Sequence, residues 1–203
     1  MPYKNRKSNR LENYDYSQNG MYFVTICTKD RVEHFGEIKD GKMILNESGE
    51  IALKNLRDVS NHFESVCLDE YVVMPNHLHC ILEIDTAVQF LDKPDVGVQF
   101  IEPVVDAGFA EGGFDKSNPY AACIGNNPML MSKTTLGKII RYCKAKTACE
   151  IRGSMDFWQF AWQKNYYDHI VRNEISLNKI REYIQENPKT WERDRNNVEN
   201  LNM

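Results

Sequence analysis

The chain has 203 residues, of which 42% are hydrophobic and 27% are charged, and its formal net charge is −4. This composition is typical of a folded domain and excludes a largely disordered chain, and no run reaches the ~18 apolar residues that a membrane span needs. The sequence pI of about 5.8 is lower than is usual for a nucleic-acid-binding protein. The charge is uneven, however: the first ten residues contain four basic residues and no acid, whereas 85–115 contain seven acids and one lysine.

The six cysteines form no CxxC pair and are scattered through apolar segments. The N-terminus is polar and has no apolar run of the kind that a cleavable signal needs. We therefore expect reduced cysteines that are mostly buried, in a soluble, cytoplasmic protein.

The first half of the chain is predicted to consist of strands with one helix between them. Aromatic and β-branched runs predict the strands, and the apolar spacing from Ile51 onward predicts the helix, with Ser48 as its N-cap. Asp40-Gly41 and Pro75-Asn76 are turn signals. After a basic arm over 1–20, the predicted elements are a strand at 22–28, a hairpin of 35–38 with 42–45, a helix at 51–63, and neighbouring antiparallel strands at 65–74 and 77–84.

The second half begins with a segment of different character. Residues 86–131 repeat Val-Gln-Phe, contain several Gly and Pro, and lack sustained periodicity, which indicates a long irregular insertion or loop. The predicted elements that follow are a helix at 132–152 capped by Ser132, a strand at 166–171, and a helix at 174–187 ended by Pro188. Together these elements predict one α+β domain over 1–203, with helices packed on a mainly antiparallel sheet.

The strongest local motif is His77-Leu78-His79-Cys80 in a predicted strand. Side chains alternate across a strand, so His77 and His79 share one face and Cys80 points to the other. Two imidazoles at this spacing can bind one divalent ion. The alternative is a pair of half-exposed histidines on a polar sheet face.

The predicted C-terminal helix is a second candidate. Leu177, Ile180 and Ile184 form its apolar stripe, and Tyr183 and Asn187, four residues apart, lie together on the flank of that stripe. A tyrosine placed there can act as a nucleophile, and the amide one turn later can act as a further metal ligand. The alternative is an ordinary aromatic residue at the edge of the core.

Nucleic-acid contacts are predicted from aromatic and basic side chains. In 160–169, Tyr166 and Tyr167 are rival nucleophiles or base-stacking residues, and His169 is a possible proton shuttle, although this segment also fits a buried strand. The predicted helix at 132–152 is basic on its polar side, where it could contact phosphates or simply face solvent. The basic residues expected to contact phosphates there are Lys138, Arg141 and Lys144.

Four segments, taken in order, resemble the single-tyrosine HUH transposases, and among them the REP-associated tyrosine transposase branch. The resemblance covers about 20–84 and 132–195 and leaves the insertion unaccounted for. The segments are Tyr22–Thr28, Tyr71–His79, Trp162-Gln163 with Tyr167–Asn173, and Ile180–Pro188 followed by Trp191.

The resemblance implies a ferredoxin-like, RRM-like fold and an enzyme that cuts and rejoins single-stranded DNA, which we expect to form hairpins. It implies that His77 and His79 bind Mg²⁺ or Mn²⁺, that Asn187 takes the third ligand position, and that Tyr183 forms a 5′-phosphotyrosine. It also allows a homodimer. Tyr167 is expected to contact DNA together with Lys138, Arg141 and Lys144.

Two alternatives of other classes remain at this stage. A non-catalytic single-stranded nucleic-acid-binding module on an RRM-like sheet would need stacking aromatics but has no use for two facing histidines. A zinc-dependent hydrolase would need three strong ligands, and the sequence shows no clear third acid or histidine.

Overall fold

The computed structural model describes residues 11, 13–85, 134–154, 158–197 and 200. Its main sheet contains β1 Gly20–Cys27, β4 Val66–Met74, β5 His77–Ile84 and β6 Tyr167–Val171. Its helices are α1 Glu47–Arg57, α2 Val59–His62, α3 Leu136–Ser154 and α4 Glu174–Glu186, with short 3₁₀ helices η1 Lys29–Arg31 and η5 Asn187–Arg193.

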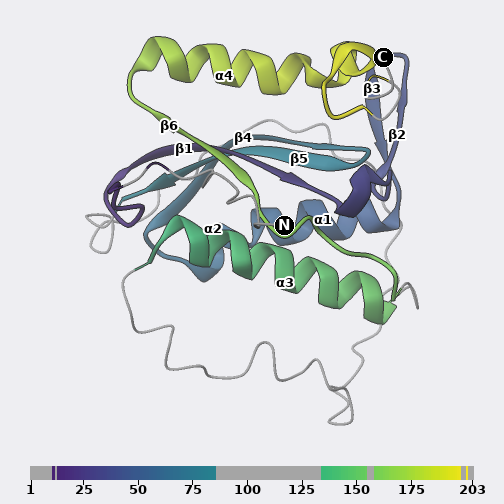
Figure 1. Cartoon of the computed structure of the whole chain (residues 1–203), viewed down its shortest axis with the longest axis horizontal. Coiled ribbons are helices and arrows are strands. Elements are labelled where there is room, and N and C mark those ends of the chain that lie inside the picture. The colour runs from purple at the N-terminus through teal and green to yellow at the C-terminus, as the bar shows by residue number, and fades with distance from the viewer. Residues whose placement is uncertain (1–10, 12, 86–133, 155–157, 198–199, 201–203) are drawn as a thin grey trace, which may run out of the picture.

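The four strands lie in the order β4-β5-β1-β6, and every pairing is antiparallel. The chain visits them as strand, helix, two strands, helix, strand, which is the ferredoxin-like arrangement. Helices α1, α2 and α3 cover one face of the sheet and α4 lies across the other (Figure 1). The predicted α+β fold is therefore confirmed.

The two faces of the sheet carry separate cores because strand side chains alternate. Leu78, Cys80 and Leu82 of β5 pack with Leu136 and Ile140 of α3 in the larger core. This burial of apolar side chains against α3 is the main stabilising contribution on this side.

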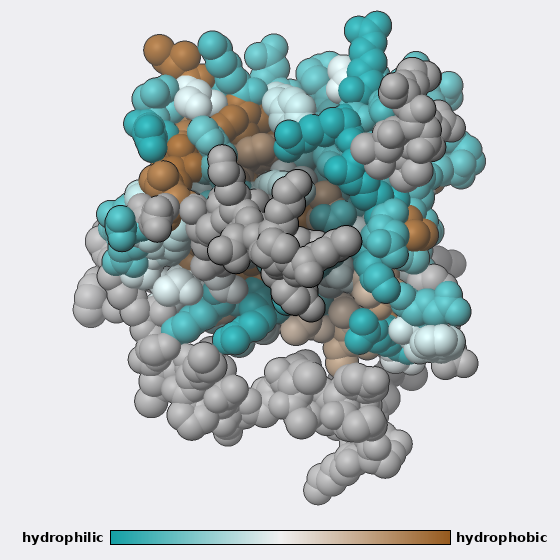
Figure 2. Space-filling model, in the orientation of Figure 1, coloured by the Kyte–Doolittle hydropathy of each residue, from teal (hydrophilic) through white to brown (hydrophobic). Residues whose placement is uncertain are grey.

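On the other face, Ile81 of β5 packs with Leu177 and Ile184 of α4, which confirms the predicted apolar stripe. Arg181 of α4 adds a two-pronged ion pair to Asp69, with Nε and Nη2 lying 2.9 and 2.7 Å from Oδ2. Asp69 follows Leu68, which packs against the larger core, so strand alternation places its carboxylate on the face that α4 covers. Figure 2 shows an apolar patch over the start of α4, where Ile175 is 72% exposed.

The predicted hairpin is confirmed as β2 Gly36–Lys39 paired with β3 Lys42–Leu45. Its two turn residues, Asp40 and Gly41, have φ of 52° and 69°. Two positive φ values match the tight turn that suits the right-handed twist of paired strands, and glycine adopts one of them at no steric cost.

The predicted helix at 51–63 is wrong in its start and its continuity. The structure has two helices there, and α1 begins earlier, with Asn46 as N-cap accepting a hydrogen bond from the Gly49 amide at 3.0 Å. Ser48, the predicted cap, is buried inside the first turn. Asparagine at this position satisfies an amide that the helix leaves unpaired, so it sets the start of the helix.

The predicted helix ends before Pro188 as expected, one residue earlier than predicted, but helical structure of another kind follows it. α4 stops at Glu186, but η5 continues through Pro188 to Arg193. Proline is compatible with the first turn of a new helix, where its missing N–H is not needed. The other predicted elements differ from the structure by a few residues at their ends, at 22–28, 65–74, 132–152 and 166–171.

Some predictions concern residues that the structure does not describe. The insertion at 86–131, Ser132 and most of the basic arm lie outside the described residues. Within them, Cys27, Cys80 and Cys143 are buried, Cys149 is half-buried and Cys67 is exposed, and all five are free thiols. No helix in the described part of the chain combines the length and apolar character required to cross a bilayer.

Candidate metal and nucleophile site

The predicted histidine pair lies at the start of β5, on the face that α4 covers. His77 and His79 have the same parity along the strand as Ile81, which packs against α4, whereas Cys80 belongs to the opposite core. The two imidazoles are buried, with exposed fractions of 0% and 1%. The shared face and the orientation of Cys80 are as predicted, but the alternative of half-exposed histidines is wrong.

The rings of the two histidines are oriented by hydrogen bonds at their outer nitrogens. Nδ1 of His77 lies 2.8 Å from Oδ1 of Asn76, and Nδ1 of His79 lies 2.8 Å from Oγ1 of Thr25, its neighbour across the β1–β5 pairing. The inner Nε2 atoms face each other at 3.0 Å. Outer partners of this kind are typical of metal-binding histidines, whose remaining nitrogen is then directed at the ion.

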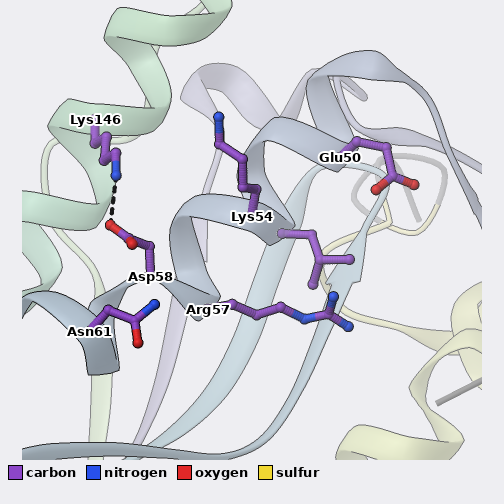
Figure 3. Close-up of a pocket in the computed structure, with 7 residues that line it drawn as sticks. Glu50, Lys54, Arg57, Asp58, Asn61 and Lys146 are labelled. Carbon is purple, nitrogen blue, oxygen red and sulfur yellow. Dashed lines mark hydrogen bonds and ion pairs between the residues drawn. The ribbon is translucent and has the colours of Figure 1, made fainter. Parts of the chain in front are cut away.

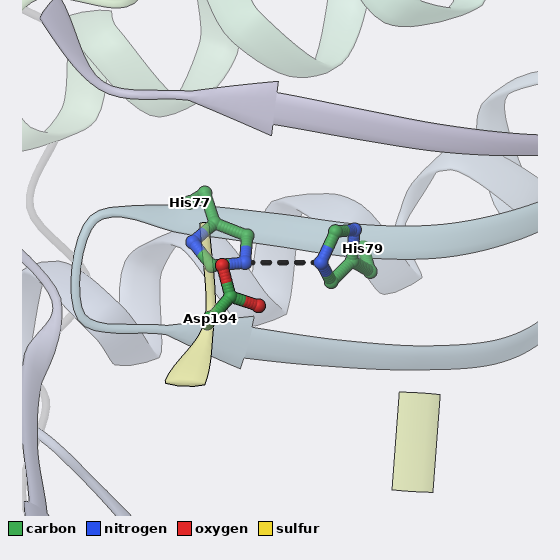
Figure 4. Close-up of side chains that lie close together, drawn as sticks. All are labelled: His77, His79 and Asp194. Carbon is green, nitrogen blue, oxygen red and sulfur yellow. Dashed lines mark hydrogen bonds between the residues drawn. The ribbon is translucent and has the colours of Figure 1, made fainter. Parts of the chain in front are cut away.

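A carboxylate that the sequence analysis missed completes the group. Asp194 follows η5, and one ligand atom from each of His77, His79 and Asp194 lies within 4.8 Å of the others. Figure 4 shows the Asp194 carboxylate turned toward the gap between the two rings. Two imidazoles and a carboxylate can hold Mg²⁺, Mn²⁺ or Zn²⁺. The premise that no third acid is available is therefore wrong.

Tyr183 brings a hydroxyl to the same place from α4. Its Oη lies 3.4 Å from Nε2 of His79 and 3.5 Å from Oδ2 of Asp194. Its ring meets those of His79 and Phe23 edge-on, with centroids 5.4 and 6.0 Å apart. Tyr183 is 42% exposed, so part of the residue remains open to solvent.

Asn187, predicted as a ligand, is the C-cap of α4 and is fully buried beside the same carboxylate. Its Nδ2 donates to Oδ2 of Asp194 at 3.3 Å. Its Oδ1 is buried without a hydrogen-bond partner among the described residues. A buried acceptor without a partner is costly, and a bound cation is one way to satisfy it, so the donor set fits a divalent ion.

Burial controls the protonation of these groups. It lowers the pKa of His77 to about 3, with smaller contributions from Arg31 and Arg195, and it lowers the pKa of His79 well below 6.5, followed by repulsion from His77. Both imidazoles are thus neutral at neutral pH, as metal binding requires. Burial and then Asp194 raise the pKa of Tyr183, so its phenol keeps its proton unless a cation lies nearby.

The structure places the predicted DNA-contact residues on two sides of the sheet. Tyr167 lies on the site's face, in the row that runs through Thr25 to His79, and the Arg195 guanidinium carbon lies 6.0 Å from its ring centre. His169 is exposed further along β6. Tyr166 instead packs against the larger core on the opposite face.

The basic residues predicted on α3 are separated from the histidines by the sheet. Lys138 and Lys144 are half-buried and Arg141 is exposed. Lys144 donates to the carbonyl of Gln163 at 2.6 Å, which ties α3 to the segment leading into β6. The structure thus gives Lys144 an internal role beside its predicted one.

A pocket of about 320 Å³ also lies away from the site. It is formed by α1, α2 and one residue of α3 and includes Lys54, Arg57, Asp58 and Lys146 (Figure 3). Several of its charged groups have partners: Lys146 pairs with Asp58 at 2.6 Å, and Arg57 donates to the Tyr71 hydroxyl at 2.8 Å.

Comparisons with known proteins give matches of different strength. No protein-family model matches the chain. A REP-associated tyrosine transposase bound to a REP hairpin is similar in structure, with a TM-score of 0.48, 16% identity, and coverage of 90% of this chain and 73% of that one. A candidate transposase of Deinococcus radiodurans gives a TM-score of 0.41, 14% identity, and coverage of 87% and 95%.

The sequence match is stronger. An uncharacterized protein of Haemophilus influenzae is 34% identical over 189 residues, which span 93% of this chain and 91% of that protein. Identity at this level over nearly the full length of both chains shows common descent. The chain belongs to the same family as this Haemophilus influenzae protein.

Proposed function

We propose that this chain is a metal-dependent tyrosine transposase that cleaves and rejoins single-stranded DNA through a 5′-phosphotyrosine at Tyr183. The observation that carries the proposal is the distance of 3.4 Å between Oη of Tyr183 and Nε2 of His79. A nucleophile in contact with a candidate metal ligand is the arrangement that phosphoryl transfer to a protein side chain needs. The resemblance of the surrounding sequence segments to HUH transposases supports the same function.

His77, His79 and Asp194 would hold the ion, with the amide oxygen of Asn187 as a further ligand. A divalent cation, expected to be Mg²⁺ or Mn²⁺, would neutralise a non-bridging oxygen of the scissile phosphate and favour the phenolate.

The protein groups account for the covalent step. Oη of Tyr183 gives up its proton to water, which a nearby cation would favour, and attacks phosphorus. The P–O3′ bond breaks, and the leaving oxygen takes up a proton to become a free 3′-OH. Because the phosphotyrosine retains the energy of the phosphodiester, a second 3′-OH can displace Tyr183 and restore the phenol, giving strand transfer without ATP.

DNA contacts are proposed on both sides of the sheet. Tyr167 lies on the site's face and would stack on a base next to the scissile phosphate. Lys138, Arg141 and Lys144 lie on α3, across the sheet, and would contact phosphates of a more distant part of a folded strand, such as a hairpin stem.

The three-ligand group favours a second candidate, a metal-dependent phosphodiesterase that uses water as the nucleophile. His77, His79 and Asp194 alone would suffice for such an enzyme. In that case Tyr183 would only border the site, and cleavage would leave no protein–DNA bond.

An end-labelled, hairpin-forming single strand incubated with the protein and Mn²⁺ tests the proposal. The wild-type protein should form an adduct that survives denaturing electrophoresis. Tyr183→Phe should abolish the adduct, whereas Tyr167→Phe, the matched tyrosine on the same face, should retain it, because the phenyl ring can still stack on a base. Cleavage by Tyr183→Phe without an adduct would support the water-dependent enzyme, and an adduct that persists in Tyr183→Phe would exclude this nucleophile. Binding without metal-dependent cleavage by the wild-type protein would support a non-catalytic module.

A further inference from the structure

The side-chain amide of Asn76 is buried, and its contacts fix its orientation. Its Nδ2 lies 3.0 Å from the carbonyl oxygen of Arg31 and 2.9 Å from that of Asn196. Both partners can only accept, so the nitrogen must face them and Oδ1 must face His77. The reverse orientation would set Oδ1 against two carbonyl oxygens, in a side chain that is 0% exposed.

This orientation determines where His77 carries its proton. Oδ1 of Asn76 can only accept, so the 2.8 Å contact requires that Nδ1 of His77 donates. The ring is 0% exposed, and full burial disfavours the charged imidazolium, so the ring carries a single proton. Nε2 of His77 therefore has a free lone pair, which is the form that binds a metal ion.

The second histidine is held differently. At 3.0 Å, the contact between the two Nε2 atoms needs one donor, and His77 has no proton there, so Nε2 of His79 donates. Nδ1 of His79 then accepts from the Thr25 hydroxyl, 2.8 Å away. A hydroxyl both donates and accepts, so Thr25 can also accept from Nδ1 once His79 turns its lone pair toward an ion.

We propose that Asn76 is a positioning residue of the metal site, which keeps the proton of His77 on Nδ1 so that Nε2 is always available to the ion. The inference rests on the proposed metal site for its functional meaning. The two ligands therefore differ. The Asn76 oxygen, which can only accept, holds His77 in its metal-binding tautomer before the ion arrives. His79 must move its proton from Nε2 to Nδ1, where Thr25 accepts it, and it then exchanges its hydrogen bond to His77 for a bond to the metal.

The same amide connects His77 to the segment that carries the third ligand. Nδ2 of Asn76 donates to the carbonyl of Asn196, whose backbone N–H donates to Oδ1 of Asp194 at 2.5 Å. Asn76 therefore has two separable roles. Its oxygen sets the tautomer of His77, and its nitrogen anchors the segment on which Asp194 lies.

Two variants separate these roles. Asn76→Asp keeps an acceptor for Nδ1 of His77 but removes both donated hydrogen bonds, whereas Asn76→Ala removes everything. Asn55→Ala is the control, because Asn55 is equally buried, lies on α1 across the sheet, and has no hydrogen-bond partner among the described residues.

The tautomers are read in metal-free protein from nitrogen-15 NMR of the histidine side chains, and Mn²⁺ affinity is measured by calorimetry. We expect a protonated Nδ1 on His77 in the wild type, in Asn76→Asp and in Asn55→Ala, and a mixture of tautomers in Asn76→Ala. Mn²⁺ affinity should fall by about 10- to 100-fold in Asn76→Ala, less in Asn76→Asp, and not in Asn55→Ala. A folded Asn76→Asp keeps the tautomer test available where Asn76→Ala does not fold.

The outcomes distinguish this inference from the proposed function. A wild-type His77 protonated on Nε2, or an Asn76→Ala protein that binds Mn²⁺ as tightly as the wild type, overturns the role of Asn76 and leaves the transposase proposal standing. A wild-type protein that binds no Mn²⁺ overturns both the metal site and the role of Asn76 in it.

Discussion

The hydroxyl oxygen of Tyr183 lies 3.4 Å from Nε2 of His79, although 104 residues separate the two in the chain. The contact depends on how α4 is seated on the sheet. Leu177 and Ile184 bury their side chains against Ile81, two residues along the strand from His79. The apolar contact that stabilises α4 therefore also sets the position of the tyrosine.

Replacing Ile184 by alanine tests this dependence. Ile184 is fully buried between α4 and the sheet, so the Ile184→Ala change should lower the free energy of unfolding by about 2–4 kcal/mol. It should also reduce adduct formation at temperatures where the protein is still folded, since α4 no longer holds Tyr183 in place. Urea denaturation followed by circular dichroism measures the first effect, and the oligonucleotide assay measures the second.

Ile175 provides the matched control on the same helix. It is 72% exposed, so Ile175→Ala should change the free energy of unfolding by no more than about 0.5 kcal/mol. Equal losses for the two variants would contradict the placement of α4.

The buried histidines predict a stability that depends on pH. In the folded, metal-free protein, the pKa of His77 lies near 3 and that of His79 lies well below 6.5. In the unfolded chain, both histidines have the ordinary pKa of 6.5. Between those limits the unfolded chain binds more protons than the folded one. Stability is therefore fully present above pH 6.5 and falls as the pH decreases toward 3, by about 1.4 kcal/mol per pH unit for each histidine.

Urea denaturation in EDTA between pH 7.5 and 5 measures this slope. His34 and His62, whose pKa values burial also lowers, add to it, so the comparison with variants is the diagnostic. His77→Gln should flatten the profile, whereas His169→Gln, at an exposed position, should not. A wild-type slope that His77→Gln leaves unchanged would show that His77 is not buried in neutral form.

Much of this site follows from local sequence. Strand alternation is enough to place His77 and His79 together and Cys80 on the other face, and helical periodicity is enough to place Tyr183 beside the apolar stripe of α4. Those predictions need only the side-chain periodicity within one strand or one helix. The orientation of Tyr183 toward the histidines needed more, because it depends on which face of the sheet α4 covers.

Asp194 could not be found this way. It lies in the polar run Glu192–Arg195, which has no periodicity, and it reaches the histidines only because the chain continues through η5 beyond Pro188 and folds back. If Pro188 is interpreted as the end of helical structure, the sequence gives no sign that the chain folds back to bring Asp194 to the histidines. The N-cap of α1 shows the same difficulty at smaller scale, since Asn46 and Ser48 are both good capping residues and only the backbone path selects between them.

Asn187→Asp should make the site less stable without metal and more responsive to it. Nδ2 of Asn187 donates to Asp194 at 3.3 Å, so the variant sets two buried carboxyl groups against each other. Loss of this hydrogen bond and repulsion between the acids should cost on the order of 2 kcal/mol at neutral pH in EDTA, even after one of them takes up a proton. A bound cation removes the repulsion, so Mn²⁺ should raise the melting temperature of this variant more than that of the wild type. An equal shift in both would show that Asn187 lies outside the influence of the ion.

Metal removal tests Asp194 as the third ligand. An ion that binds only the folded protein adds stability that grows with its concentration, about 2.7 kcal/mol at a hundred times the Kd. Mn²⁺ should therefore raise the wild-type melting temperature, and excess EDTA should reverse the rise. Asp194→Ala should lose most of this shift, because a buried carboxylate is replaced by a side chain without a ligand atom. Glu192→Gln removes an acid two residues away at an exposed position and should keep the full shift. If Glu192→Gln and Asp194→Ala lose the shift equally, Mn²⁺ is responding to the general negative charge of this segment and Asp194 is not a ligand.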